Sequence, residues 1–133
     1  MSVLETGNFG NNEATDWLYD LEETYGAELL AEAFDAIMKA EFHEQADCCI
    51  ALAAAEIVAA AKGKPAPDLP DDARKWLGNQ DTSDVTKIKA LSKKAITAVK
   101  KIQNKSELRD QWEESDEWHS WQMVVEGLLK RLQ

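Results

Sequence analysis

The stretch from Cys48 to Ala61 constrains the fold of this chain most, because it is apolar on nearly every side of a helix and contains no glycine or proline. Alanine dominates it, larger aliphatic side chains lie between the alanines, and Glu56 is its single charged residue. A helix that is apolar all round belongs in a protein interior, where small side chains let neighbouring backbones approach. The stretch is also too short to span a bilayer. It therefore predicts the central helix of a bundle.

Amphipathic patterns before and after this stretch predict the helices that surround it. They run from a cap at Asn11 or Asn12 to Gly26, from Ala27 to the polar cluster at Glu41, from Pro70 to Gly78, from a cap at Ser83 through Ile102, from Ser106 or Glu107 through Trp112, and from Trp118 to Leu132. Tyr25 falls on the apolar stripe of the first helix, and residues 84–105 form one continuous helix in this interpretation. No segment alternates with period two for long enough to make a strand.

The sequence thus predicts an all-α fold, a single domain over residues 1–133 with five to seven helices and an N-terminal Gly/Asn loop over residues 5–12. A chain of 133 residues can bury one core without disulfides or metals. Residues 1–12 lack the basic and apolar regions of a signal peptide. Cys48 and Cys49 are adjacent, so a helix points them about 100° apart and reduced thiols are expected. We therefore predict a cytoplasmic protein.

Charge is divided unevenly along the chain, whose net charge is -10. Residues 1–61 carry thirteen acids against Lys39 alone, and residues 84–105 carry seven lysines against Asp84 alone. An acidic protein repels nucleic acid and anionic membranes at long range. The charge therefore favours a protein partner, which could be a second copy pairing its acidic face with a lysine-rich one, and argues against a membrane.

The lysines of residues 84–105 all lie opposite the apolar stripe of the predicted helix, where they could contact nucleic-acid phosphates. They lack the interleaved aromatic and arginine residues that stack on bases or hold phosphates in bidentate fashion. A solvated face, or one that docks on an acidic surface, is the favoured interpretation, and nucleic-acid binding remains the alternative.

The Gly/Asn loop has two interpretations. Glycines and asparagines are typical of tight turns, so the loop is expected to insert Phe9 into the core while its asparagines cap the following helix. Alternatively, Asn8, Asn11, Glu13 and Asp16 offer the oxygen ligands that a hard cation prefers, although their spacing fits no known calcium loop. The capping interpretation is favoured.

Glu56 is the carboxylate with the most unusual surroundings. If it is buried, it must be paired, hydrogen-bonded or protonated, and perturbed carboxylates are common at active sites. An arginine, an indole or a helix cap would satisfy it for structural reasons alone. The structural interpretation is favoured.

His43 and Asp47, with Glu44 and Cys48, offer ligands at helical i, i+4 spacing and are the candidates for a zinc or iron site. Acidic helices often contain such pairs, and no second matching element occurs in the sequence. A solvated helix end is the favoured interpretation.

Trp118 and Trp121 bracket His119 at the start of the last predicted helix. Packing is the first explanation of tryptophans at core spacing, and an exposed pair would be a protein-binding anchor. No arrangement of serine, cysteine or histidine indicates a nucleophile with its base, and no phosphate-binding motif occurs. No cofactor is predicted, and an enzymatic role is not favoured.

Three stretches together carry a family resemblance: Thr6 to Trp17, Ala51 to Ala60 followed by Asp68-Leu69-Pro70, and Ser106 to Arg109 with Trp112. They span almost the whole chain, which on this basis resembles the bacterial domain-of-unknown-function 4259 family. The resemblance implies a one-domain helical fold and brings no activity, cofactor or catalytic residue with it.

The leading hypothesis from the sequence is a non-enzymatic protein-binding or regulatory module, of the sort that immunity proteins and antitoxins represent. Its candidate binding residues are Asn8, Asn11, Asp16, Glu56, Trp118 and Trp121. The alternatives are a carboxylate-based metal-binding protein or hydrolase, and nucleic-acid binding through the lysine-rich residues 84–105.

Overall fold

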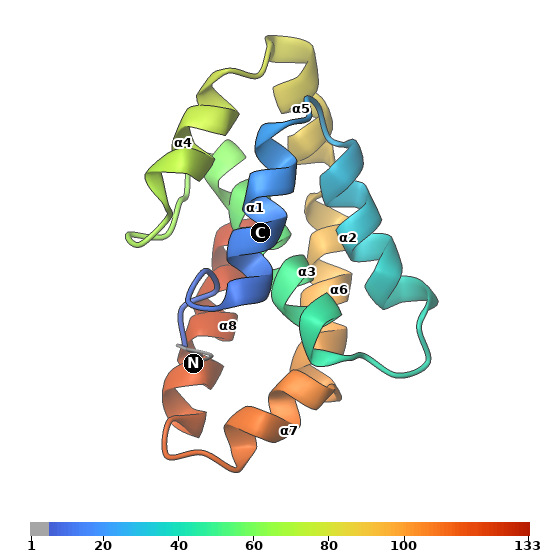
Figure 1. Ribbon diagram of the computed structural model, residues 1–133, viewed down its shortest axis with the longest axis vertical. Helices are drawn as coiled ribbons and strands as arrows, with labels where there is room; N and C mark the ends of the chain where they lie inside the picture. Colours follow the sequence, from blue (N-terminus) through green and yellow to red (C-terminus); the bar gives the residue numbers. More distant parts are fainter. Residues whose placement is uncertain (1–5) are drawn as a thin grey trace.

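Helix α3 (Gln45–Ala61) lies in the middle of the molecule and packs against each of the other helices that the structure describes (Figure 1). The structure, a computed structural model, describes residues 6–133, so Glu5 of the predicted loop lies outside the described residues. All residues from Ala51 to Ala59 are buried, Glu56 included. The predicted central helix is therefore confirmed.

Eight helices form within residues 6–133, and these residues contain no strand. In chain order they are α1 (Asn12–Glu22), α2 (Glu28–Lys39), α3, α4 (Asp71–Gly78), α5 (Thr82–Ala90), α6 (Ser92–Asn104), α7 (Glu107–Glu113) and α8 (Trp118–Leu132). The all-α class is confirmed, and the predicted range of five to seven helices falls one short. No helix in this part of the chain has both the length and the apolar character needed to cross a membrane.

The lysine-rich residues 84–105 form two helices where one continuous helix was predicted. The chain turns at Leu91, whose amide donates to the Ile88 carbonyl three residues back, 3.0 Å away. Both α5 and α6 pack on α3, and the turn between them lets each present its own apolar residues to that central helix. The predicted cap at Ser83 is also wrong, because the Asp81 carboxylate accepts the hydrogen bond from the Asp84 amide at 2.8 Å.

The first helix is shorter than its apolar stripe predicted. It ends at Glu22, and the chain then turns through Gly26, whose φ of +82° is a conformation that glycine adopts readily. Tyr25 lies in this turn and is 78% exposed, so its predicted place on the buried stripe is wrong. Because α1 ends before Tyr25, the helical spacing of this residue does not place it on the buried side of the helix.

The N-terminal loop performs the capping role predicted for it. The Asn11 side chain accepts a hydrogen bond from the Ala14 amide at 2.7 Å, which satisfies one of the free donors at the start of α1. Phe9 packs against the core and is half-buried. The loop is also held against α3 by the hydrogen bond from the Asn8 side chain to Glu56.

Candidate functional site

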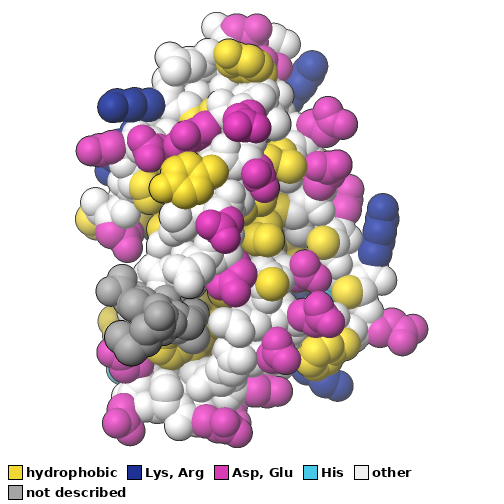
Figure 2. Space-filling model, viewed as in Figure 1, with side chains coloured by type: hydrophobic (Ala, Val, Ile, Leu, Met, Phe, Trp, Pro, Cys, Tyr) yellow, Lys and Arg dark blue, Asp and Glu magenta, His cyan; other side chains and the backbone are white. Residues whose placement is uncertain are grey.

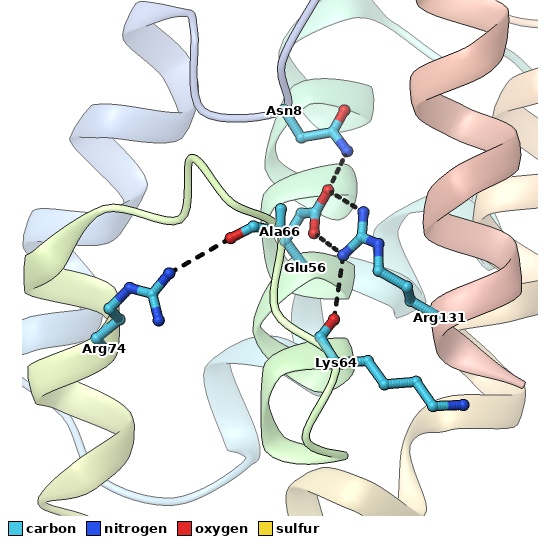
Figure 3. A network of polar contacts seen from close by, with 6 residues as sticks. All are labelled: Asn8, Glu56, Lys64, Ala66, Arg74 and Arg131. Atoms are coloured by element: carbon cyan, nitrogen blue, oxygen red, sulfur yellow. Dashed lines mark hydrogen bonds and ion pairs between the residues drawn. The ribbon is translucent and has the colours of Figure 1, made fainter.

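Glu56 is the centre of a polar network that joins four parts of the chain (Figure 3). Its carboxylate accepts hydrogen bonds from Asn8 Nδ2 at 2.7 Å, Arg131 Nη1 at 2.7 Å and Arg131 Nη2 at 3.1 Å. Arg131 Nη1 also lies 3.4 Å from the Lys64 carbonyl oxygen. The N-terminal loop, the central helix, the connector after it and the last helix therefore meet at one buried carboxylate.

This network satisfies the requirement that the sequence placed on Glu56. The residue is 2% exposed, and both of its oxygens have donors in bidentate pairing with a guanidinium. Arg131 was not singled out from the sequence, because nothing local to its position marks a residue that pairs with another 75 positions earlier. The arrangement accounts for Glu56 and Asn8 as structural groups.

The other loop candidates do not gather around a cation. Asn11 is occupied with its capping bond, and Asp16 is exposed on α1. The cavity beside Asn8 and Asn11 has a volume of about 10 Å³, which is room for one water. Among residues 6–133, no group of three or more His, Cys, Asp and Glu side chains is placed to hold a metal ion.

His43 and Asp47 are separated by a change in backbone structure. His43 precedes α3, which begins at Gln45, so the helical i, i+4 geometry assumed for this pair is absent. The His43 carbonyl instead accepts a hydrogen bond from the Glu107 amide at 2.9 Å, and the Glu107 carboxylate accepts one from the Gln45 amide at 2.8 Å. These residues connect the starts of α3 and α7 to each other.

Trp118 and Trp121 stack on one another, with ring centroids 5.7 Å apart. Trp121 is 1% exposed and belongs to the core, whereas Trp118 is half-buried. The Arg109 guanidinium lies 5.0 Å from the Trp118 ring centroid and also pairs with Glu113 at 2.9 Å. The pair is therefore one core residue with a partly exposed neighbour that Arg109 covers.

Six of the seven lysines in residues 84–105 are exposed, five of them on α5 and α6 and the sixth, Lys105, directly after α6. The seventh, Lys94, forms an ion pair with Asp35 of α2 at 2.7 Å, and this hydrogen bond lowers the pKa of the Asp35 carboxyl. Part of the basic face is thus paired with the chain's own acidic helix.

The most distinctive surface lies over α1 and α2. Figure 2 shows acidic side chains across this face with hydrophobic patches between them, while lysine and arginine lie around its edge. Three large aromatic residues of this segment are exposed: Tyr19 on α1 at 59%, Tyr25 between α1 and α2 at 78%, and Phe42 after α2 at 58%. We call the exposed residues of α1, α2 and their adjoining loops the acidic face; its carboxylates include Asp16, Asp20, Glu22, Glu23, Glu28, Glu32 and Glu41.

The family of the chain follows from a family model described as Domain of unknown function (DUF4259), which matches residues 3–124. The chain belongs to this family. The match covers nearly the whole molecule, from the N-terminal loop into α8, and includes Asn8 and Glu56 but not Arg131. The comparisons with curated proteins and with solved structures found no match to this DUF4259 chain.

Proposed function

We propose that this protein is a non-enzymatic binding module that docks a basic partner protein on its acidic face. The observation that supports the proposal most is the presence of three exposed aromatic side chains among the carboxylates of α1, α2 and their loops. Aromatic residues are enriched in the parts of interfaces that supply most of the binding energy. Carboxylates around them supply attraction at long range and selectivity for a basic partner.

The outer sides of α1 and α2 are available for binding because the fold does not need them for its core. The core is closed on the other side of α1 and α2, where Trp17, Leu21, Leu30, Phe34 and Ile37 are buried. The outward residues of both helices therefore contribute little to the core. A charged and aromatic outer surface costs the fold little, and it gives a partner area to bury.

A partner-capture experiment tests the proposal. Immobilised protein is compared with a variant that carries Tyr19→Ser and Phe42→Ser, and with the control variant Met123→Ser, which removes a residue of α8 that is 62% exposed. We expect one basic protein to be enriched by the unaltered chain and by the control, and lost from the acidic-face variant. Equal recovery on all three would refute the proposal.

A second copy of the chain, although its net charge is -10, offers a local basic surface to the acidic face through the lysines of its α5 and α6. Sedimentation velocity distinguishes this case before any capture is attempted. A dimer that Tyr19→Ser and Phe42→Ser convert to monomer would identify the partner as the chain itself. A monomer at all concentrations would leave the face for a different protein.

A further inference from the structure

We propose that a pocket at the edge of the acidic face, between the end of α1 and one side of α4, binds an arginine side chain of the partner. The inference rests on the proposed function and names the group that would anchor the partner. The pocket has a volume of about 240 Å³. Its lining residues are Glu22, Tyr25, Asp72, Lys75, Trp76, Asn79 and Gln80.

The charge at this end of α1 is opposite to what helix stability favours. The last carbonyls of a helix carry partial negative charge, so cationic side chains stabilise that end. The last turn of α1 has no basic residue and instead carries Glu22, with Glu23 as the C-cap. Asp72 faces the same pocket from α4. Glu22 and Asp72 therefore give the pocket a negative potential that a bound cation would relieve.

Two hydrogen bonds hold the walls of the pocket together, one from Trp76 of α4 and one to Gln80, which follows α4. The Trp76 indole donates to the Thr24 carbonyl at 2.9 Å, and the Gln80 side-chain oxygen accepts from the Gly26 amide at 2.7 Å. These bonds hold the residues on both sides of Tyr25. A site whose backbone is fixed before binding loses less entropy when the ligand arrives.

Tyr25 supplies the aromatic surface that makes arginine a better ligand than a simple ammonium. Its side chain is 78% exposed although its neighbours are fixed, so the ring projects from an ordered turn. A guanidinium stacks on an aromatic face and donates to two carboxylates from one plane.

Lys75 is the residue of the pocket that opposes the binding of a cation. It lines the same space and has no ion-pair partner within residues 6–133. Its ammonium would repel an arginine and compete for Glu22 and Asp72. Replacing Lys75 with an uncharged residue should therefore strengthen the binding of arginine, which tests the assignment of the pocket.

The test uses the full chain and capped arginine (N-acetyl-arginine methylamide), followed by NMR at the Trp76 indole and Gly26 amide. Capped citrulline, of similar shape without charge, and capped lysine are the comparison ligands. We expect saturable shifts with arginine, weaker ones with lysine and none with citrulline. Glu22→Gln and Asp72→Asn should each weaken arginine binding by about threefold, and Lys75→Met should strengthen it by about threefold.

Asp116→Asn, in the turn between α7 and α8 at the opposite end of the molecule, is the matched charge control and should leave binding unchanged (Figure 1). Equal shifts with citrulline, or arginine binding that ignores Glu22, Asp72 and Lys75, would overturn the pocket assignment. If a partner is still captured through Tyr19 and Phe42 in that case, the proposed function stands without the pocket. If arginine binds and no partner is captured, the pocket stands and the proposed function fails.

Discussion

Arg131 of α8 holds Glu56 of α3 with both of its terminal nitrogens, in an ion pair whose acidic side chain is 3% exposed and whose basic side chain is 24% exposed. The last helix is thereby attached to the central one through the buried carboxylate of Glu56. Removing one member of such a pair leaves an uncompensated charge in the interior, which costs more than the pair itself contributes.

The first prediction follows from this difference between losing one member of the pair and losing both. Arg131→Met should lower the free energy of unfolding by about 3 kcal/mol, because Glu56 would keep its burial and lose its counter-charge. Adding Glu56→Gln to that variant should recover part of the loss. Urea unfolding followed by circular dichroism measures both.

Arg74→Met is the matched control, since Arg74 is exposed and makes one hydrogen bond, of 3.4 Å, to the Ala66 carbonyl (Figure 3). Its effect on the free energy of unfolding should stay within about 0.5 kcal/mol. Equal effects of the two arginine variants would contradict the prediction.

The second prediction concerns Asn8, which donates to Glu56 at 2.7 Å from a buried position. Asn8→Ala should cost about 2 kcal/mol, since one carboxylate oxygen loses a donor. Asn8→Asp should cost more at neutral pH, because two carboxylates would then lie in contact. Repulsion raises the pKa of the new carboxyl, so its protonated form can donate, and the difference between the two variants should shrink as the pH falls towards about 4.

Unfolding measured at several pH values tests this dependence. Asn12→Asp is the control, because Asn12 is exposed in the first turn of α1, where a negative charge is favourable. It should show little loss at any pH. A difference between Asn8→Asp and Asn8→Ala that stays constant with pH would mean that the new carboxyl does not face Glu56.

These residues also show how far the sequence alone could predict the fold and the site. The central position of α3 followed from its apolar residues, since local composition determines which helix lies at the centre, whereas the sequence left open whether Glu56 is buried. Its partner Arg131 could not be found in the same way, because the pairing depends on how α8 lies across α3. The exposure of Tyr25 was missed because a residue beyond a helix end can match the stripe by chance. The acidic face was visible as composition, and its aromatic residues became apparent only when their exposure was known.

The third prediction tests the corrected start of α5. Asp81→Ala should lower the free energy of unfolding by about 1 kcal/mol, because the carboxylate that accepts from the Asp84 amide is removed. Ser83→Ala should change it by less than about 0.5 kcal/mol, since Ser83 is exposed within the first turn and has no capping bond. Thermal unfolding of the two variants side by side is sufficient. A larger loss from Ser83→Ala would restore the cap that the sequence pattern suggested.

The fourth prediction concerns the adjacent thiols of Cys48 and Cys49, which are free and buried in α3. Burial raises the pKa of each thiol from 9.0 to about 12. The thiolate is the reactive form, so alkylation at pH 8 should be roughly a thousandfold slower than for a thiol of ordinary pKa, before limited access slows it further. Iodoacetamide labelling followed by mass spectrometry measures the rate. Labelling should become fast only in denaturant, and fast labelling of the folded chain would show that this part of α3 opens readily.

The same shift makes the fold sensitive to alkali. The pKa of each thiol is higher in the folded chain than in the unfolded chain. The stability that the buried, protonated thiols contribute is therefore complete below about pH 9 and is lost as the pH rises towards 12. The loss should approach about 1.4 kcal/mol per pH unit for each thiol within that window. Replacing both cysteines with alanine removes these two titrations, so the variant should lose less stability than the unaltered chain between pH 9 and 11. Parallel pH profiles for the two proteins would show that the thiols contribute nothing to the alkaline loss of stability.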